Sequence, residues 1–421
     1  MSRLFHIYGM LFTATGMFAV VSYWHDFPRF HCKVDHMKAA VFHKIGDISV
    51  DNVEDPRIEK QDDIILKVTS TAICGSDLHI LDGFFPQLKD QVMGHEFMGI
   101  IEETGSAITH LKKGDRVVVP FPIACGHCHF CNNHLPTACE NSNKEHYGPE
   151  GDMMKGKGGG LFGYTDLYGA YAGGQAEYVR VPYANFSPRV VPENMTDEQV
   201  LFLTDIFPTG WSAIDWAQLK GGETVAIFGS GPVGLMAQKA AWLQGAKRVI
   251  AIDPLPYRLN MAKRVNNVET INPHEVDPIQ AIYDMTNGRG ADVCVDAVGV
   301  EAERSFFEKV KAVLNVEKGT MKVLDNCIKA VRRGGTVTVV GVYGTPYDNF
   351  PVHRIFDKGI TLKFGQAPVQ NYIDHLFTLV QEEKVILHDI VTHKLPLSEA
   401  TNAYEIFKKK EDDCVKVILK P

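Results

Sequence analysis

The sequence has no cluster of basic residues, and its formal net charge is -8. A surface that binds the phosphates of nucleic acid needs clustered lysine and arginine, so this charge balance argues against a nucleic-acid partner. The run Lys408-Lys409-Lys410 is short and continues directly into Glu411-Asp412-Asp413, which is typical of a solvated helix end. The sequence also has no internal repeats, which argues against repeat architectures.

Charged residues are also missing from Leu4 to Trp24, an apolar stretch close to the ~20 residues that a membrane span needs. Three interpretations are open: an uncleaved anchor, a signal peptide, or a translation start at Met37. No clear small-x-small cleavage site precedes Phe27, and export suits a chain rich in free thiols poorly. We favour the start at Met37, because residues 1–36 carry no part of any motif described below. The protein is then expected in the cytoplasm, and at a membrane only if residues 1–24 are a real anchor.

The length of 421 residues is too great for one ordinary core, so two domains are expected. Residues 37 to about 200 contain short apolar runs separated by Gly, Asp and Pro, which favours β-structure. After Pro208, strands alternate with helices, which predicts a parallel, doubly wound sheet. We expect an extension at 1–36, a β-rich domain at 37–204 and 347–421, and a nucleotide-binding domain at 205–346.

Four of the nine cysteines follow one another at x2, x2 and x7 spacing: Cys125, Cys128, Cys131 and Cys139. Four clustered thiolates close a tetrahedral shell around one Zn²⁺ and leave no open position, so this group predicts a structural zinc site. The long Gly/Tyr-rich stretch Met153–Gly174 is expected to lie over this lobe, near the active site. The scattered Cys32, Cys294, Cys327 and Cys414 are interpreted as inert.

A second group of metal-ligating residues consists of Cys74, His95 and the neighbouring Glu96. One Cys and one His with a carboxylate nearby are what an open, reactive zinc requires, with a further ligand supplied from elsewhere in the chain. A closed site and an open site in one chain favour a zinc enzyme over a protein that uses zinc only for stability.

Gly229-Ser-Gly231-Pro232-Val233-Gly234 is a GxGxxG string that follows the apolar run Val225–Phe228 and opens a helical pattern. In that context it predicts a dinucleotide site, in which backbone N–H groups at a helix N-terminus face the pyrophosphate. Asp253 ends the next strand at the offset expected for the acid that binds the adenosine ribose, and it would repel a 2′-phosphate, so NAD is favoured over NADP. Pro232, Val233 and Arg258 are further candidates for cofactor contact.

Several motifs together resemble those of the zinc-containing medium-chain alcohol dehydrogenases: Cys74-Gly-Ser76-Asp77-Leu-His79, Gly94-His95-Glu96, Gly114-Asp-Arg-Val, the four-cysteine group and the glycine fingerprint. The match runs from Met37 to the C-terminus with every motif in order. Leu203–Gly210 and Gly365–Val369 are similar to the formaldehyde dehydrogenase and dismutase branch of that family. The resemblance implies an α/β protein with a β-rich GroES-like catalytic domain and a Rossmann domain, assembled as a homo-oligomer, either a dimer or a tetramer.

The resemblance also implies the roles of individual residues. Cys74, His95 and Asp205 would hold the catalytic Zn²⁺, with Glu96 able to approach the metal and Asp77 orienting His95. Hydride would pass between an alcohol or aldehyde substrate and NAD, and the proton would leave through Ser76 and His79. Gly75 stands where many family members have a basic residue on the pyrophosphate, which should weaken one phosphate contact.

Other interpretations remain open at the level of the sequence. The enzyme could be an aldehyde dismutase that holds NAD(H) permanently, or the chain could be a non-catalytic NAD-binding or membrane-tethered partner protein. Asp205, which precedes Pro208 and a helical stretch, could also be a helix cap and not a ligand.

Overall fold

The computed structural model describes residues 36–84, 90–143, 158–299, 320–343 and 350–421. Residues His36–Pro421 form one compact unit. The interpretations of residues 1–35, and the part of the Gly/Tyr-rich stretch at 153–157, lie outside the described residues. Among the described residues, no helix is both long enough and apolar enough to cross a membrane.

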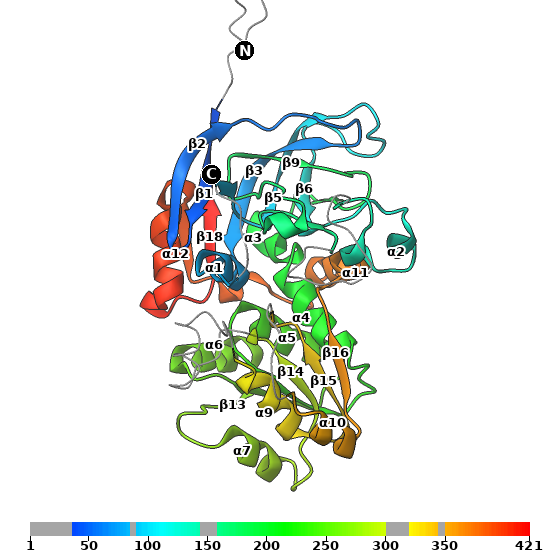
Figure 1. Ribbon diagram of the computed structural model, residues 1–421, viewed down its shortest axis with the longest axis vertical. Coiled ribbons are helices and arrows are strands. Elements are labelled where there is room, and N and C mark those ends of the chain that lie inside the picture. Colours follow the sequence, from blue (N-terminus) through cyan, green and yellow to red (C-terminus); the bar gives the residue numbers. More distant parts are fainter. Residues whose placement is uncertain (1–35, 85–89, 144–157, 300–319, 344–349) are drawn as a thin grey trace, which may run out of the picture. The chain divides into compact units, whose positions relative to one another are not determined.

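The β-rich part of the chain is built on a mixed sheet of seven strands (Figure 1). Their order is β10 (Arg189–Val190), β6 (Arg116–Val119), β5 (Glu96–Thr104), β3 (Ile64–Ile73), β18 (Val417–Lys420) and β17 (His393–Pro396), and β9 (Tyr178–Val181) also pairs with β3. In the antiparallel pair of β3 and β5, Ala72 lies opposite Glu96. The end of β3 and the start of β5 therefore meet, which brings Cys74 close to His95 and Glu96.

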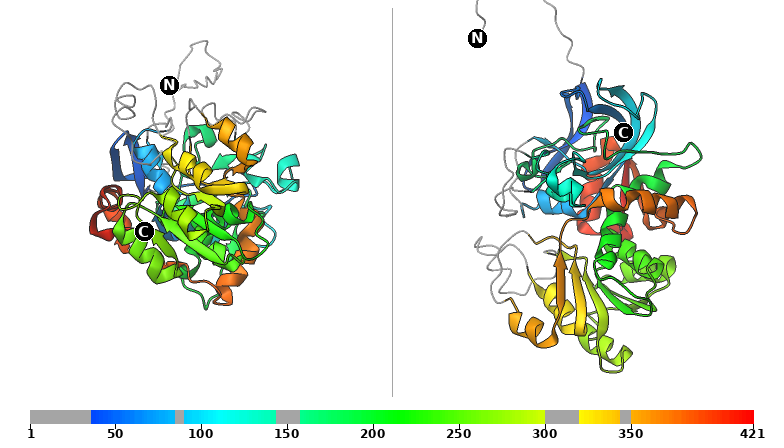
Figure 2. Two further views of the ribbon diagram at one scale, coloured as in Figure 1. Left: turned by 90° about the horizontal axis from the view of Figure 1, so that it is seen from below. Right: turned by 90° about the vertical axis from the view of Figure 1, so that its right-hand side faces the viewer.

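Strand β18 pairs antiparallel with β3 on the side away from β5, with Val417 opposite Ile73. The C-terminal strands β18 and β17 thus extend the sheet formed by strands of the first part of the chain, and β18 lies between β3 and β17 (Figure 1, Figure 2). Two smaller sheets complete this part: β2 (Asp47–Glu54), β1 (His36–Lys44) and β4 (Gln91–Val92) form one, and β7 (Pro122–Ile123) and β8 (Gly160–Leu161) form the other.

The remaining strands form a six-stranded parallel sheet in the order β13 (Glu269–Ile271), β12 (Arg248–Ile252), β11 (Thr224–Phe228), β14 (Ala291–Asp296), β15 (Val331–Val339) and β16 (Thr361–Phe364). Counted along the chain from β11, this is the 3-2-1-4-5-6 order of a dinucleotide-binding fold. The middle strands β11, β12 and β14 are mostly apolar and mostly buried, which fits a parallel sheet covered on both faces.

The edge strand β16 pairs with β15 in parallel, with Thr336 opposite Thr361. It lies beyond residue 346, where we expected the nucleotide-binding segment to end, so the sheet extends further along the chain than predicted. The physical reason is that β16 is short and mostly exposed and contains a lysine, which gives it no apolar strand pattern.

The helices take their bounds from local signals. For example, α6 (Pro256–Asn266) starts with proline in its first turn and ends before Asn267, which has a positive φ of 49°. Within the described residues, the other α-helices are α1 (Gly75–Leu81), α2 (His129–Asn132), α3 (Asp197–Val200), α4 (Ile206–Asp215), α5 (Pro232–Leu243), α7 (Pro278–Met285), α9 (Lys322–Ala330), α10 (Val352–Lys358), α11 (Val369–Gln381) and α12 (Ala400–Lys409). Single turns of 3₁₀-helix are η1 (Pro136–Ala138), η3 (Asp166–Tyr168), η4 (Leu201–Leu203), η6 (His388–Ile390), η7 (Leu397–Glu399) and η8 (Glu411–Asp413).

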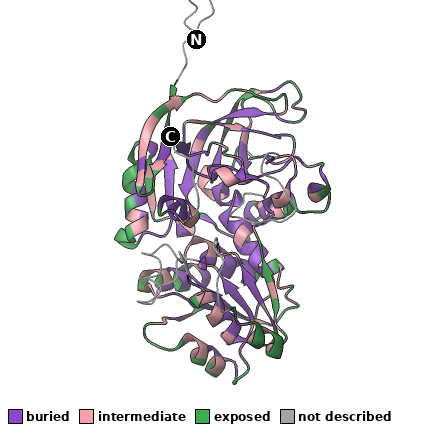
Figure 3. Cartoon of the chain, in the orientation of Figure 1, coloured by how far each residue is buried: buried purple, intermediate pink, exposed green. Residues whose placement is uncertain are grey.

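One hydrophobic cluster joins the mixed sheet to the parallel sheet. It contains residues of η4 and α4, the buried face of α5, and apolar residues of α11 such as Val369 and Ile373. Most residues of η4, α4 and α5 are buried, whereas α11 buries one face and exposes the other (Figure 3). Helix α4, which follows directly after Asp205, therefore packs in the shared core and gives that residue a fixed position.

Candidate active site and cofactor cleft

The four predicted thiols Cys125, Cys128, Cys131 and Cys139 come together in one lobe. All are buried and free of disulfides, and their sulfur atoms lie within 4.8 Å of one another. Each of the pairs Cys125–Cys131 and Cys128–Cys139 has its Sγ atoms 4.0 Å apart. Backbone or side-chain N–H groups point at three of the sulfurs, which suits thiolates. This donor set fits one closed tetrahedral metal shell.

The second predicted group also comes together, with ligand atoms of Cys74, His95, Glu96 and Asp205 within 4.8 Å of one another and all four residues buried. Cys74 is the N-cap residue of α1 and follows β3, while His95 and Glu96 lie where β5 begins. Asp205 comes from a distant part of the chain, at the start of α4. Three separate elements therefore supply this cluster.

Asp205 occupies the N-cap position of α4, but its side chain makes no capping hydrogen bond to the helix backbone. Its Oδ2 lies 3.3 Å from His95 Nε2 and 3.6 Å from Cys74 Sγ. Its Oδ1 accepts a hydrogen bond of 2.7 Å from the Thr209 hydroxyl one turn later. The carboxylate thus faces the other candidate ligands, and Thr209 holds it in that direction.

The charges in this cluster favour a bound cation. Burial, together with the negative charges of Asp205 and Glu96, raises the pKa of the Cys74 thiol. Burial also raises the pKa of Glu96, although the ammonium of Lys416 works in the opposite direction. Lys416 Nζ donates to Glu96 Oε1 at 2.6 Å, while the buried Oε2 accepts no hydrogen bond within the described part of the chain. A thiol, an imidazole and two carboxylates in such proximity fit a divalent metal ion.

Asp77 lies behind His95, with Oδ1 3.1 Å from His95 Nδ1 and both side chains buried. Its second oxygen, Oδ2, accepts a hydrogen bond of 3.0 Å from the backbone N–H of Cys74. One carboxylate therefore contacts two candidate ligands and directs the Nε2 atom of His95 towards the cluster.

Ser76 and His79 both lie on α1, three residues apart and therefore on one face of the helix. The Ser76 hydroxyl is 3.2 Å from His95 Nε2, and both Ser76 and His79 line one cavity, which is described below. The His79 ring contacts Phe84 edge to face, with ring centroids 5.7 Å apart.

The glycine fingerprint forms the turn between β11 and α5. Gly229 has a φ of +98°, and a side chain on Gly234 would stand only 1.9 Å from the Gly229 carbonyl oxygen. Both positions therefore require glycine locally, for backbone conformation and for close packing respectively. A side chain on Gly231 would meet only the tip of Arg258, at 3.6 Å, so this position keeps the loop accessible from the cavity.

Asp253 follows β12 and is buried beside this loop. Its Oδ2 accepts a hydrogen bond of 2.8 Å from the backbone N–H of Ser230, and its Oδ1 accepts one of 2.9 Å from that of Leu255. Arg258 Nη1 lies 3.8 Å from Asp253 Oδ2. Asp253 thus also orders the glycine loop, a role that the sequence alone did not indicate.

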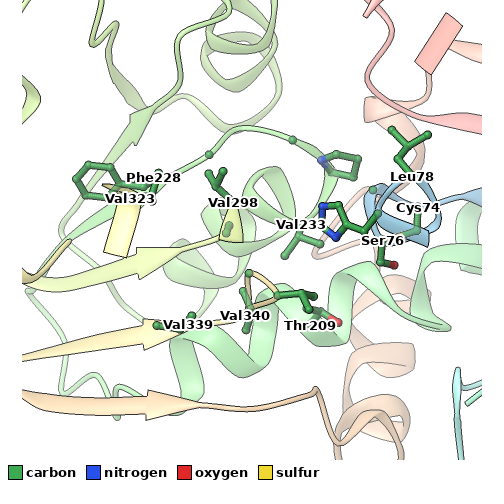
Figure 4. A pocket seen from close by; sticks show the side chains of 18 of the residues that line it. Cys74, Ser76, Leu78, Thr209, Phe228, Val233, Val298, Val323, Val339 and Val340 are labelled. Atoms are coloured by element: carbon green, nitrogen blue, oxygen red, sulfur yellow. The ribbon is translucent and has the colours of Figure 1, made fainter. Parts of the chain in front are cut away.

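A cavity of about 970 Å³ connects the two groups of residues. It is lined at one end by Cys74, Ser76, His95 and Asp205, and at the other by the glycine loop, Asp253 and Arg258. Figure 4 shows Cys74, Ser76 and Thr209 near Val233, with apolar side chains such as Val298 and Val340 further along. One elongated ligand, or two ligands bound side by side, could therefore contact both the metal-ligand cluster and the dinucleotide loop.

Aromatic side chains cover the metal-ligand cluster. The rings of Phe121 and Tyr164 contact His95 edge to face, with centroids 6.0 Å and 5.9 Å from that of His95. Tyr164 in turn contacts Tyr168 at 5.6 Å, and burial raises the pKa of Tyr168 to about 12. Both tyrosines belong to the Gly/Tyr-rich stretch, and they line the cavity together with Leu161, so this part of the stretch lies near the site as expected.

Known proteins share these features. The family model of the alcohol dehydrogenase GroES-like domain matches residues 60–193, and the zinc-binding dehydrogenase model matches residues 232–312. An uncharacterized zinc-type alcohol dehydrogenase-like protein of Bacillus subtilis (strain 168) is 49% identical over 390 residues, which cover 91% of this chain and 100% of that protein. The chain belongs to the zinc-type alcohol dehydrogenase family.

Further relatives and solved structures are similar to most of this chain. Formaldehyde dismutase of Pseudomonas putida is 34% identical over 88% of this chain and 95% of its own length. The alcohol dehydrogenase from Thermus sp. ATN1 has a TM-score of 0.78 and 35% identity, covering 91% of this chain and 99% of that structure. A zinc-binding dehydrogenase structure from Sinorhizobium meliloti 1021, bound to NADP, has a TM-score of 0.72 and 25% identity over 92% of this chain and 100% of its own. This chain is thus an oxidoreductase with a GroES-like and a Rossmann part.

Sequence reasoning missed four residues around the site. Lys416, Thr209 and Gln175 contact Glu96, Asp205 and Asp77 respectively, and Tyr404 contacts Gln175. The sequence does contain a signal for Lys416. It is a lysine within the apolar run Cys414–Leu419, where an unpaired charge would be costly to bury. Gln175 and Tyr404 left none, because nothing in their neighbourhood in sequence connects them to Cys74 or His95.

Proposed function

We propose that the protein transfers hydride between an alcohol or aldehyde (hydrate) substrate and NAD. The observation that carries this proposal is the single cavity that joins the Cys74, His95 and Asp205 cluster to the glycine loop and Asp253. A zinc ion held by Cys74, His95 and Asp205 would supply Lewis-acid activation of the substrate oxygen. The second zinc would be held by the four-cysteine lobe, where no position is left for a substrate.

The residues of the chain then carry the proton and position the reactants. The hydroxyl of Ser76 lies at the cluster and takes the proton that the substrate alcohol loses, and His79, on the same face of α1, passes it towards solvent. A nicotinamide cofactor bound at the glycine loop would supply the acceptor for the hydride that the substrate carbon loses, so that oxidation of the alcohol would be balanced by reduction of the cofactor. The aromatic side chains Phe121 and Tyr164 exclude water from this region.

Preference for NAD over NADP is assigned to Asp253. Its carboxylate lies at the end of β12 beside the glycine loop, where the adenosine ribose is bound in dinucleotide folds. A 2′-phosphate there would meet this negative charge. Arg258 is the nearby cation that would favour such a phosphate, but its guanidinium lies 3.8 Å from Asp253, which already offsets its charge.

The test is a substrate screen with the purified protein. Formaldehyde, short alcohols and threonine-like amino alcohols are supplied with NAD⁺ or NADP⁺, the absorbance of the reduced cofactor is followed, and zinc is measured by elemental analysis. We expect reduction of NAD⁺ with at least one alcohol or aldehyde, and two zinc ions per chain. Turnover of aldehyde to alcohol and acid with no reduction of added NAD⁺ would instead indicate a dismutase. Absence of both activities would reject the proposal.

Two further expectations belong to this proposal. We infer a homo-oligomer, supported by the exposed apolar side chains Val352 and Phe356 of α10, of which Phe356 is 88% exposed, close to the edge strand β16. Light scattering that gives the mass of a single chain would contradict it.

We also infer a cytoplasmic location, because clustered free thiols persist in a reducing compartment.

A further inference from the structure

A fully buried glutamine connects the predicted metal-ligand cluster to a helix near the C-terminal end of the chain. We propose that Gln175 is a positioning residue for the catalytic metal site, and that Tyr404 on α12 fixes its orientation. The inference rests on the proposed function only in assuming that Cys74 and His95 bind a metal ion. Neither Gln175 nor Tyr404 contacts the cluster directly, and both act through Asp77.

The hydrogen bonds of Gln175 define one orientation of its amide. Nε2 donates to Asp77 Oδ2 at 3.2 Å and to the Ala72 carbonyl oxygen at 3.1 Å, and both partners can only accept. Oε1 accepts a hydrogen bond of 2.7 Å from the Tyr404 hydroxyl. If the amide were turned over, its oxygen would face a carboxylate and a carbonyl, so the chemistry of the partners selects the orientation.

Asp77 transmits this orientation to the cluster. The oxygen that accepts from Gln175 also accepts from the backbone N–H of Cys74 at 3.0 Å, and the other oxygen lies 3.1 Å from His95 Nδ1. A carboxylate held on both sides cannot rotate about its own axis without losing one of these contacts. The positions of the His95 ring and of the Cys74 backbone therefore depend on Asp77, Gln175 and Tyr404.

The backbone around Gln175 is arranged to admit this side chain. The Gln175 N–H donates to the Met93 carbonyl at 2.9 Å, which places the residue beside the segment that leads to His95. A side chain on Gly94 would meet Gln175 Cγ at 2.4 Å, and Gly94 has a φ of +97°. The glycine before the candidate ligand therefore provides the space that Gln175 occupies.

The side chains of this network are buried away from water, so the loss of any one of their hydrogen bonds costs more free energy than it would at the surface. Gln175 and Asp77 are completely buried, and Tyr404 and His95 are almost completely buried. Without the Gln175 donor, Asp77 Oδ2 would keep the hydrogen bond from the Cys74 backbone N–H but lose the contact that holds the carboxylate from the other side, so Asp77 would shift. Such a movement would displace His95.

The test replaces Gln175 with methionine, which fills similar space without donating, and Tyr404 with phenylalanine, which removes one hydroxyl. Both variants are compared with wild type by the visible spectrum of the cobalt(II)-substituted protein and by the rate of zinc release to a chromogenic chelator. Removing residues that orient metal ligands lowers metal affinity about 10- to 100-fold. For Gln175→Met we therefore expect zinc release about tenfold faster and a changed cobalt spectrum. For Tyr404→Phe we expect a smaller change in the same direction.

A matched control is Gln370→Met. Gln370 is also a buried glutamine whose Nε2 donates to a backbone carbonyl, that of Pro122 at 2.6 Å, but it makes no contact with Asp77. This variant should unfold at a lowered temperature like Gln175→Met, yet release zinc like wild type. If Gln175→Met does not fold, Tyr404→Phe decides, because it keeps the packing.

The inference would be overturned if both Gln175→Met and Tyr404→Phe released zinc at the wild-type rate and had the wild-type cobalt spectrum. Equal changes in the Gln370→Met control would overturn it as well, since the effect would then be general loosening. Failure of the proposed function would look different: the wild-type protein itself would bind no cobalt outside the four-cysteine lobe.

Discussion

Replacement of Asp205 by asparagine separates the metal-ligand interpretation from the helix-cap interpretation. Asparagine has nearly the same shape, and its Oδ1 can still accept the hydrogen bond that Thr209 donates at 2.7 Å. As a helix cap, asparagine would serve about as well as aspartate. What the substitution removes is the negative charge near His95 Nε2 and Cys74 Sγ, at 3.3 Å and 3.6 Å.

The expected magnitudes follow from these contacts. Loss of residues that only orient ligands lowers metal affinity about 10- to 100-fold, so loss of a charge that faces the metal should cost at least about 100-fold in affinity. Turnover should fall by a similar factor. The metal-free protein keeps the Thr209 hydrogen bond, so its free energy of unfolding should change by no more than about 1 kcal/mol.

The assay combines elemental analysis, initial rates and thermal unfolding in the presence of a chelator. Asp277→Asn is the control, because Asp277 is a true N-cap whose Oδ1 accepts from the backbone of Ile279 at 2.8 Å and of Gln280 at 3.3 Å. That variant should keep zinc content and turnover. A D205N protein that binds two zinc ions and turns over at the wild-type rate would refute the assignment of Asp205 as a ligand.

Three further substitutions test the remaining assignments. Cys128→Ser should lose one zinc and at least ~1 kcal/mol of folding stability, whereas Cys74→Ser should lose turnover with the fold kept, and equal unfolding of both would contradict this division. Asp253→Ser should raise the ratio of kcat/KM for NADP over NAD about tenfold, and an unchanged ratio in steady-state kinetics would reject the role of its charge. Lys416→Met should cost about 3–5 kcal/mol in denaturant unfolding, because Glu96 would remain buried without its cation, and a cost below ~1 kcal/mol would show that Glu96 is protonated.

The parts of the site that could be predicted from sequence are those encoded within a few residues. The spacing of the four cysteines and the strand–glycine–helix context of Gly229–Gly234 are local, and both groups come together in the structure as expected. Asp205 was accessible only through the resemblance, since its own neighbourhood also fits a cap. Its contact with Cys74 joins residues 131 positions apart, which no local pattern encodes.

What sequence reasoning missed depends on packing between distant segments. Gln175 and Tyr404 are 229 positions apart, and their hydrogen bond exists only because α12 packs against the sheet that carries Cys74. Likewise β16 was missed because its own composition does not indicate a strand. It is a strand because it pairs with β15. The second role of Asp253, as acceptor for two backbone N–H groups, follows from loop geometry that a motif does not specify.

The position of β18 has a consequence for the order in which the protein matures on the ribosome. Domains usually fold in the order in which they are synthesised. Here β3, which leads into Cys74, receives its neighbour β18 and the Lys416 partner of Glu96 only after the whole parallel sheet has been made. The nucleotide-binding sheet can therefore complete first, and the nascent metal pocket remains open on one side until residues 416–420 arrive. A ribosome stalled before residue 414 would carry a chain whose dinucleotide fold is complete, while the proposed catalytic metal site still lacks Lys416 and the strand beside β3.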